Sequence, residues 1–415
     1  MKLALLVFVI AITARGLVSV VQVAYGVHGL PFLPLSTWDD FYQGYVTWLG
    51  YLQHGLLPYR DFYAYKYTPL FLYSLYPFFL AGGAQLAALP IVLSDAATAA
   101  VVYLIVNRLV PTKIAFAAGL VYAFSPFVLY YEDYLWLSSQ PMTLFILLAV
   151  YLFAEKRPSL SFASLAVAVM FKQEALFVLP AYLAIYARGY GRETLKGVVI
   201  FVAVLAVVSL PFLVAAPRAY LASINYYQVI SFGPPEQSLP AAAAMTQTLT
   251  PSPNPLGGCG MTTLPSLFTG TLCGSIVNMQ EFAQSLVLGR INQIGFFVAP
   301  FLLALSASAA LMIRKAPSFL QTMCTYSYLG SAIVFAGLVE PYIGYYFVPV
   351  YAMILSSVTD LRTLAVGVGA TVLSLTLLEG PFQVILPLAS LFLITVLQLR
   401  ALADKSRTRY EGLLA

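Results

Sequence analysis

Charged residues are scarce in this chain. Only 9% of its 415 residues are charged, with 16 acidic and 21 basic side chains, whereas 61% are hydrophobic. Soluble globular proteins carry about 25% charged residues, so these few charges cannot coat a water-facing surface of this size. The scarcity excludes a soluble enzyme, a nucleic-acid binder and a disordered chain, and it favours a protein that lies in a membrane.

Cysteine and histidine are also scarce. Three cysteines are too few for a disulfide scaffold, although Cys259 and Cys273 share one loop and could bond to each other if the geometry allows. The two histidines, His28 and His54, argue against a His-based zinc site. The motifs of phosphate-binding loops, dinucleotide-binding turns and HExxH metalloproteases are absent from the sequence.

Apolar runs that alternate with polar breaks predict about twelve membrane spans. The expected fold is therefore an all-α polytopic membrane protein, with interfacial helices in its first outer loop. The first apolar run reaches Tyr25 without a small-residue cleavage site, which favours an uncleaved anchor over a signal peptide. The expected spans cover residues 3–25, 84–107, 114–130, 140–154, 158–171, 175–187, 197–216, 292–313, 318–338, 342–359, 363–378 and 382–399.

The basic residues divide unevenly between the two sides of this topology. With the N-terminus in the cytoplasm, 15 of the 21 bases fall on the inner side and 5 on the outer side. The positive-inside rule therefore favours cytoplasmic N- and C-termini, in a plasma membrane or endoplasmic reticulum. Ten acids then lie outside, so we expect the chemistry on the extracytoplasmic face.

The topology divides the chain into three parts. An N-terminal membrane module covers 1–217 and includes a first outer loop at 26–83, which we expect to be catalytic. A long outer loop follows at 218–291, and residues 292–415 form C-terminal membrane helices with a cytoplasmic tail.

Two charges fall inside the predicted membrane core. Arg15 lies about 12 residues from the inner end of the first span, and Asp95 lies 12 residues before Asn107 at the inner end of the second. These depths match at 1.5 Å per residue, and charges in a bilayer core usually face a partner. Arg15 and Asp95 are therefore expected to form a structural pair.

Two adjacent acids open an aromatic helix in the first outer loop. Helical spacing of apolar residues from Ser36 to Gln53 predicts an amphipathic helix that lies at the membrane interface. If Ser36 caps this helix, Asp39 occupies the acidic position of a capping box, whereas Asp40 has no such structural role. Asp40 is the preferred general base and Asp39 the alternative.

Three outer bases are candidates for binding a phosphate. Lys66 precedes an apolar run that ends at Gly82, is too short to span and predicts an interfacial or re-entrant helix. Arg60 lies beside Asp61, with which it could simply pair, and Lys66 could simply snorkel to the interface. Lys172 lies between two spans too short to cross a core of about 30 Å, so it is expected to be recessed.

Further outer acids are candidates for contacts with a sugar or an acceptor. Glu132 and Asp133 lie among aromatic residues between two spans, and Glu174 follows Lys172 at the recessed junction. Glu340 and Tyr342 lie in a tyrosine-rich segment farther along. A divalent ion could bind Glu132 and Asp133 instead. The structural alternative is a solvated turn or an aromatic belt.

Several of these motifs resemble the GT-C superfamily of integral-membrane glycosyltransferases, over about residues 1–180. The Tyr67-Thr68-Pro69-Leu70 segment and Asp95 are most similar to the GPI mannosyltransferase I family, except that Trp38 stands where that family's Asp-x-Asp motif has its first Asp. The Asp40-Phe41-Tyr42 segment also resembles polyprenol-phosphate-mannose-dependent mannosyltransferases of glycosyltransferase family 87.

The resemblance implies inverting transfer of a sugar, mannose in these families, from a β-linked polyprenyl phosphate to an acceptor hydroxyl. The acceptor would belong to a lipid, a glycan or a protein. Asp40 would act as the base, and Lys66, Arg60 or Lys172 would stabilise the leaving phosphate. No cofactor is firmly implied, although a divalent metal is compatible. The alternatives are a secondary transporter or lipid-linked-sugar flippase, and a non-catalytic membrane scaffold.

Overall fold

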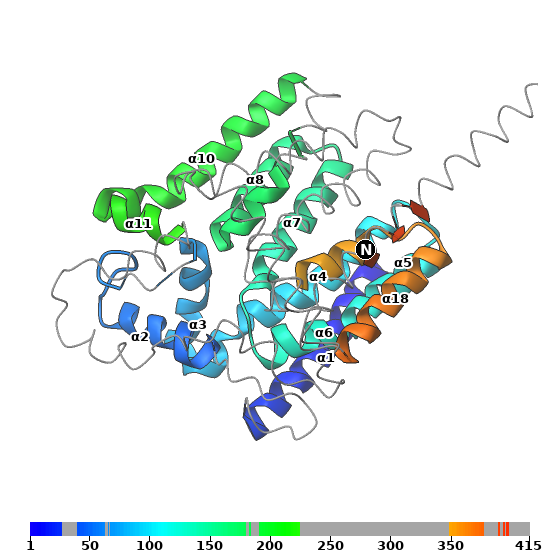
Figure 1. Cartoon of the computed structure of the whole chain (residues 1–415), viewed down its shortest axis with the longest axis horizontal. Coiled ribbons are helices and arrows are strands. Elements are labelled where there is room, and N and C mark those ends of the chain that lie inside the picture. The colour runs from blue at the N-terminus through cyan, green and yellow to red at the C-terminus, as the bar shows by residue number, and fades with distance from the viewer. Residues whose placement is uncertain are drawn as a thin grey trace, which may run out of the picture.

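The computed structural model describes residues 1–26, 40–62, 65, 67–179, 182–183, 191–224 and 348–376, with 389–390, 393–394 and 396–397. Within these residues all regular secondary structure is helical, apart from one isolated bridge between Pro58 and Phe62. The all-α prediction is confirmed (Figure 1). The predicted spans at 292–313 and 318–338 lie outside the described residues, so the total of twelve stays a prediction.

Five of the described helical segments are long and apolar enough to cross a membrane, which supports a polytopic membrane protein. These segments are Lys2–Tyr25, Pro69–Ala87, Leu89–Val106, Thr112–Tyr134 and Arg192–Ala215. Large apolar side chains of the first and last of them, such as Leu5, Val20 and Val207, are exposed. Lipid tails suit such surfaces as well as a protein core does.

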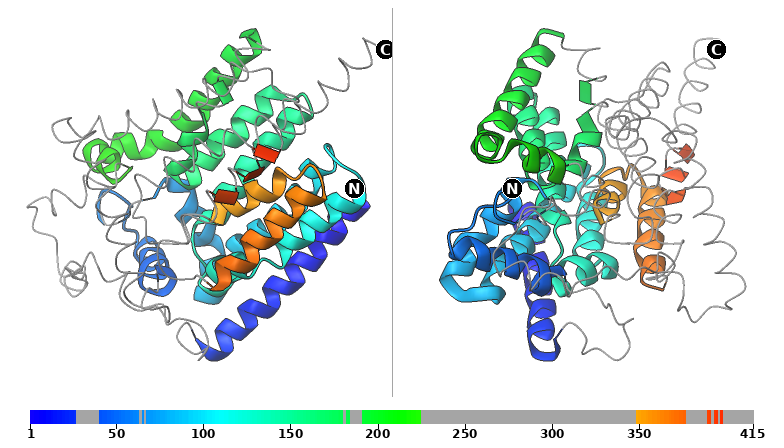
Figure 2. Two further views of the ribbon diagram at one scale, coloured as in Figure 1. Left: turned by 45° about the vertical axis from the view of Figure 1, so that its right-hand side comes forward. Right: turned by 60° about the vertical axis from the view of Figure 1, so that its left-hand side comes forward.

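A bundle of packed helices carries the main core. Helix α1 (Lys2–Tyr25) packs on α4 (Leu89–Val106) and α5 (Thr112–Ala123), and α4 also packs on α7 (Ser139–Ala154). Helix α7 packs on α8 (Pro158–Phe171), which packs on α10 (Gly191–Ala215). Helices α17 (Val348–Ser356) and α18 (Leu361–Thr376) lie against α5 on the other side (Figure 2).

Close approach within this bundle depends on Gly119 of α5. A Cβ atom at this position would lie 3.1 Å from Tyr103 Cβ of α4 and 3.2 Å from Val7 Cγ1 of α1. Small residues at helix contacts let backbones approach closely, which is the usual source of packing energy in a membrane. Gly119 therefore allows three helices to meet at one point.

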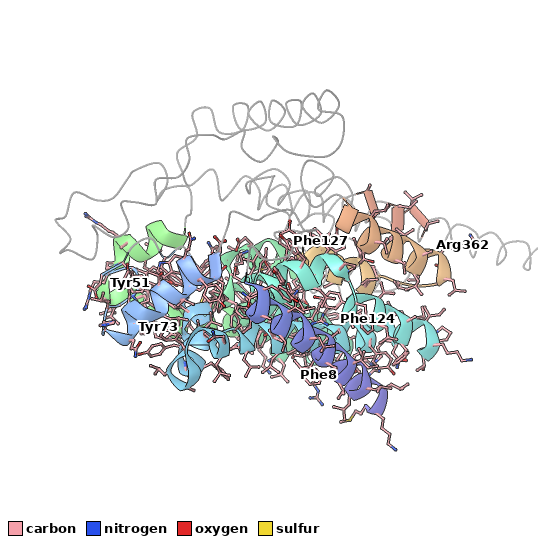
Figure 3. All side chains as sticks on the ribbon, turned by 90° about the horizontal axis from the view of Figure 1, so that it is seen from below. Phe8, Tyr51, Tyr73, Phe124, Phe127 and Arg362 are labelled. Atoms are coloured by element: carbon pink, nitrogen blue, oxygen red, sulfur yellow. The ribbon has the colours of Figure 1, made fainter. Side chains whose placement is uncertain are left out.

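The first outer loop builds a second, aromatic core at one end of the molecule. It contains the π-helix η1 (Asp40–Val46), α2 (Thr47–Gln53) and α3 (Pro69–Ala87), and α11 (Pro217–Ile224) closes it through Tyr220. Figure 3 shows Tyr51 and Tyr73 on this side and Arg362 on the opposite side. Buried rings of this core include Phe41, Tyr45, Tyr59, Tyr65, Tyr67 and Phe71.

Helix α3 is divided by a kink at its two glycines. Gly82 and Gly83 have non-helical backbone angles, and Gly83 has a φ of 71°, a conformation that glycine adopts without steric cost. The apolar run that starts at Pro69 is therefore interrupted where the sequence predicted its end. By length and composition the whole of α3 could nevertheless cross a membrane.

Two turns that were predicted on the same inner side do share one end of the bundle. Arg108, after α4, forms an ion pair with Glu155, after α7. The contact joins the α4–α5 turn to the α7–α8 turn. The other ends of α5 and α7, between which the chain forms α6 and η2, therefore face the end of the molecule that carries the aromatic core.

The predicted third span, 114–130, lies inside the candidate span Thr112–Tyr134, but its second half is not a regular α-helix. Helix α5 ends at Ala123, and it is followed by the short helix α6 (Pro126–Val128) and the π-helix η2 (Leu129–Tyr134). Pro126 cannot donate a backbone hydrogen bond, so the regular helix ends before it. The predicted span at 175–187 also differs, since Gln173–Val178 form the 3-10 helix η3.

Candidate functional site

A fully buried ion pair joins the first helices of the bundle. Arg15 Nε lies 2.5 Å from Asp95 Oδ2, and Tyr122 donates a hydrogen bond of 2.7 Å to the other Asp95 oxygen. Arg15 Nη1 also donates to the carbonyl oxygens of Ala11 and Ala123, at 3.2 and 2.9 Å. The structure thus brings Arg15 and Asp95 together, and the pair joins α1, α4 and α5.

Glu132 and Asp133 are buried rather than exposed in a turn. Both side chains are 0% exposed, so the alternative of a solvated turn is wrong. The break at Pro126 and the following π-helix η2 turn these acids inward. Asp133 Oδ2 lies 3.6 Å from Arg15 Nε, which places Arg15 between two carboxylates.

Trp136 connects η2 to the first outer loop. It is fully buried in a left-handed backbone conformation with a φ of 51°. Its indole N–H donates to Ser19 Oγ of α1 at 3.3 Å, and its ring meets that of Phe41 in η1 at 4.9 Å. The acid-bearing turn and the helix that begins with Asp40 therefore pack against the same side chain.

Lys172 is buried at the end of α8, with an exposed fraction of 1%. Its Nζ atom lies 3.4 Å from Ser139 Oγ, 3.6 Å from Glu174 Oε1 and 5.9 Å from the ring centroid of Tyr67. It also interacts electrostatically with Glu132. The recess predicted from the short neighbouring spans agrees with this burial.

Asp40 opens η1 and is partly buried. Burial, with the nearby hydroxyl of Tyr67 and charge of Asp40, holds the pKa of Tyr45 well above its usual value. The hydroxyls of Tyr45 and Tyr67 lie 3.4 Å apart, and Tyr67 in turn faces Lys172. Two tyrosines thus connect the surroundings of Asp40 to those of Lys172.

The backbone on both sides of Lys66 is anchored, although Lys66 itself lies outside the described residues. Tyr59 donates a hydrogen bond to the Tyr67 carbonyl at 2.7 Å, and Tyr65 donates to the Thr68 carbonyl at 2.8 Å. Thr68 Oγ1 donates to the Val169 carbonyl of α8 at 2.8 Å. This ties the loop segment to the helix that ends beside Lys172.

Arg60 is paired with its neighbour instead of joining these residues. Its guanidinium donates two hydrogen bonds to Asp61, at 2.9 and 2.8 Å, and its side chain is half exposed. These hydrogen bonds lower the pKa of Asp61. The Leu57 N–H donates a further hydrogen bond to the same carboxylate, which also lowers its pKa. The pairing of Arg60 with Asp61 is the sequence-based alternative to phosphate binding, and the structure shows the pair.

Three of the other predicted site residues, Asp39, Glu340 and Tyr342, lie outside the described residues. Sequence reasoning missed Tyr45, Tyr67, Trp136 and Ser139. Tyr45 stood out only as part of an apolar stripe and Tyr67 only as part of a family motif, and no local pattern shows that a loop tyrosine reaches a lysine about a hundred residues later. No group of three or more His, Cys, Asp or Glu side chains in the described part could hold a metal ion.

The fold and these residues define a polytopic helical membrane protein that has buried charged side chains in its bundle and an acidic residue in the adjoining loop. Residues 69–217 match the family model of dolichyl-phosphate-mannose-protein mannosyltransferases. The match supports a membrane glycosyltransferase of the GT-C type that uses a lipid-linked sugar donor. It includes Asp95, Glu132, Asp133, Lys172 and Glu174. No curated protein and no solved structure matches the chain.

Proposed function

We propose that this protein transfers mannose from a polyprenyl phosphate to an acceptor hydroxyl at the extracytoplasmic face of the membrane, with inversion. The observation that carries the proposal is the buried Lys172, which Tyr67 and Tyr45 connect to the surroundings of Asp40. The match to mannosyltransferases over residues 69–217 supports the donor class.

Lys172 would stabilise the phosphate that leaves. As the sugar's bond to the phosphate breaks, negative charge builds up on the phosphate oxygens. A cation held in a buried site stabilises such charge more strongly than it would in water. The contacts of Lys172 with Ser139 and Glu174 hold its side chain in position before the donor binds. Lys66 is proposed as a second phosphate contact, because its neighbours Tyr65 and Tyr67 are anchored in the loop core.

Asp40 would act as the general base. Its carboxylate would take the proton of the acceptor hydroxyl while that oxygen attacks the anomeric carbon, and the polyprenyl phosphate would leave from the opposite face. A β-linked donor would then give an α-linked product. A positioned base of this kind contributes about 10²- to 10⁴-fold to a rate. Asp39 remains the alternative base.

A transporter or flippase is less well supported by the deep charges. Arg15, Asp95 and Asp133 occupy one another within the bundle, whereas transport sites offer charges near the midplane to a substrate or ion. A scaffold would not need a buried lysine beside acids and a loop carboxylate.

The proposal is tested with the purified full chain, labelled short-chain polyprenyl-phosphate mannose and a mixture of lipid, glycan and peptide acceptors. We expect transfer to one acceptor class and an α-linkage in the product. Glu155→Gln, which alters a partly exposed acid in the α7–α8 turn, is the matched control and should transfer at the wild-type rate. Absence of transfer, or retention of the β-linkage, would contradict the proposal.

A further inference from the structure

Glu132 is a buried acid whose hydrogen-bonding capacity is only partly used by the chain. Neither carboxylate oxygen makes a hydrogen bond of ordinary geometry, although the backbone N–H groups of Ser139 and Gln140 face it. The neighbouring Ser138 Oγ is also buried without such a bond, although it lies near the Tyr45 hydroxyl. Buried polar groups are almost always paired with protein, water or a ligand, so both side chains are prepared for a further partner.

The charges around Glu132 indicate the chemistry of that partner. Arg15 is occupied by Asp95 and Asp133, so Lys172 is the cation that faces Glu132, and it is shared with Glu174. The side chains around Glu132 therefore offer more hydrogen-bond acceptors than donors. A group that fits it donates hydrogen bonds to Glu132 and carries its own negative charge close to Lys172.

The described residues contain no group of three or more His, Cys, Asp or Glu side chains that could hold a metal ion. A sugar bonded to a phosphate satisfies both requirements. Its hydroxyls donate hydrogen bonds, and its phosphate is anionic. Because the two are directly bonded, a phosphate at Lys172, beside Ser139, brings the sugar to Ser138 and Glu132.

We infer that Glu132 and Ser138 form the subsite for the sugar of the lipid-linked donor, with Glu132 accepting a hydrogen bond from one ring hydroxyl. This rests on the proposed function and deepens it, because it identifies residues that select the sugar. Asp133 has a different role. Its oxygens also make no hydrogen bond of ordinary geometry, but Oδ2 faces Arg15 Nε at 3.6 Å, and Trp136 anchors the end of the same turn. These contacts orient Asp133 toward Arg15 and support the position of Glu132.

The test compares short-chain polyprenyl-phosphate mannose with its four monodeoxy analogues, each lacking one hydroxyl of the sugar. For the wild type, kcat/KM should fall about 10²-fold or more for at least one analogue, because a site built for a hydroxyl rejects a ligand without it. Glu132→Gln should lose about 10- to 100-fold with the parent donor, as expected for one hydrogen bond to a charged group. Its discrimination against that analogue should shrink by the same factor.

Ser138→Ala gives a second route to the answer if Glu132→Gln does not fold, and a smaller loss of the same selectivity is expected. Glu155→Gln is the matched control and should keep the wild-type pattern. Loss of activity by one factor for all five donors would show that Glu132 only supports the start of α7, and would overturn the inference. So would unchanged kinetics of both variants, or equal use of all five donors by the wild type.

If the wild type transfers nothing, the proposed function fails and binding decides the subsite separately. Stabilisation of the purified protein against heat by the mannose donor, reduced for one analogue and insensitive to that hydroxyl in Glu132→Gln, would keep the subsite. Equal stabilisation of both proteins by every donor, or none at all, would overturn it.

Discussion

The bundle holds two groups of buried charges that differ in how fully the chain satisfies them. In the deeper group, Arg15 Nε lies 2.5 Å from Asp95 and its Nη1 donates to two backbone carbonyls, although Asp133, at 3.6 Å, makes no hydrogen bond of ordinary geometry. In the other group, Lys172 has contacts of 3.4 and 3.6 Å, and Glu132 makes no hydrogen bond of ordinary geometry. Burial alone therefore does not distinguish structural charges from functional ones. We propose that the second group, unlike the first, also binds a substrate.

Substitutions in the deeper group, around Arg15, should mainly lower the stability of the protein. Arg15→Met leaves Asp95 and Asp133 buried without a cation, so we expect a loss of about 3–5 kcal/mol of stability. The measurement is the thermal unfolding midpoint in detergent. The double variant Arg15→Met with Asp95→Asn should recover part of the loss. A wild-type midpoint in Arg15→Met would show that the two groups do not differ in this way.

Substitutions in the other group, around Lys172, should mainly lower the rate of transfer. Lys172→Gln removes the cation proposed for the leaving phosphate, and kcat should fall about 10²- to 10³-fold. Heat stability should change less than in Arg15→Met, since the contacts of Lys172 with Ser139 and Glu174, at 3.4 and 3.6 Å, are longer than the 2.5 Å contact of Arg15 with Asp95. Steady-state transfer kinetics and a melting curve on the same preparation give both values. A large fall in stability with full activity per folded molecule would reverse the comparison.

Close packing around the deeper group can be tested at Gly119. Gly119→Val would press a side chain against Tyr103 and Val7, and overpacking of this kind costs about 1–3 kcal/mol. Gly16→Val on α1 is the matched control, because a Cβ there has nothing within 4 Å. Equal melting points of the two variants would contradict the close approach.

The smallest effect is expected at the exposed pair in the loop. Because Arg60 lowers the pKa of Asp61 in the folded protein, the pair stabilises the loop above the ordinary pKa of 3.8. That contribution disappears as the pH falls through the lower folded value. Asp61→Asn should therefore lower the protease resistance of the loop slightly at pH 7 and not at the acid limit. A difference that grows on acidification would refute the sign.

Sequence reasoning located the deep pair because helical rise converts residue counts into depth, and Arg15 and Asp95 match in depth. It located the recess of Lys172 because two short spans cannot cross a bilayer. It missed the burial of Glu132, since the break at Pro126 and the π-helix after it have no clear local signal. It also missed Trp136 and Tyr67, whose roles arise from contacts between distant segments.

In the mechanism that we propose, a loop carboxylate and a buried lysine together transfer a lipid-linked sugar. The most direct measurement is single-turnover transfer from labelled polyprenyl-phosphate mannose by the wild type, Asp40→Asn and Asp39→Asn. We expect wild-type donor binding in Asp40→Asn with a rate reduced about 10²- to 10⁴-fold, and a smaller loss in Asp39→Asn. Full activity in a variant that lacks both acids would contradict this mechanism.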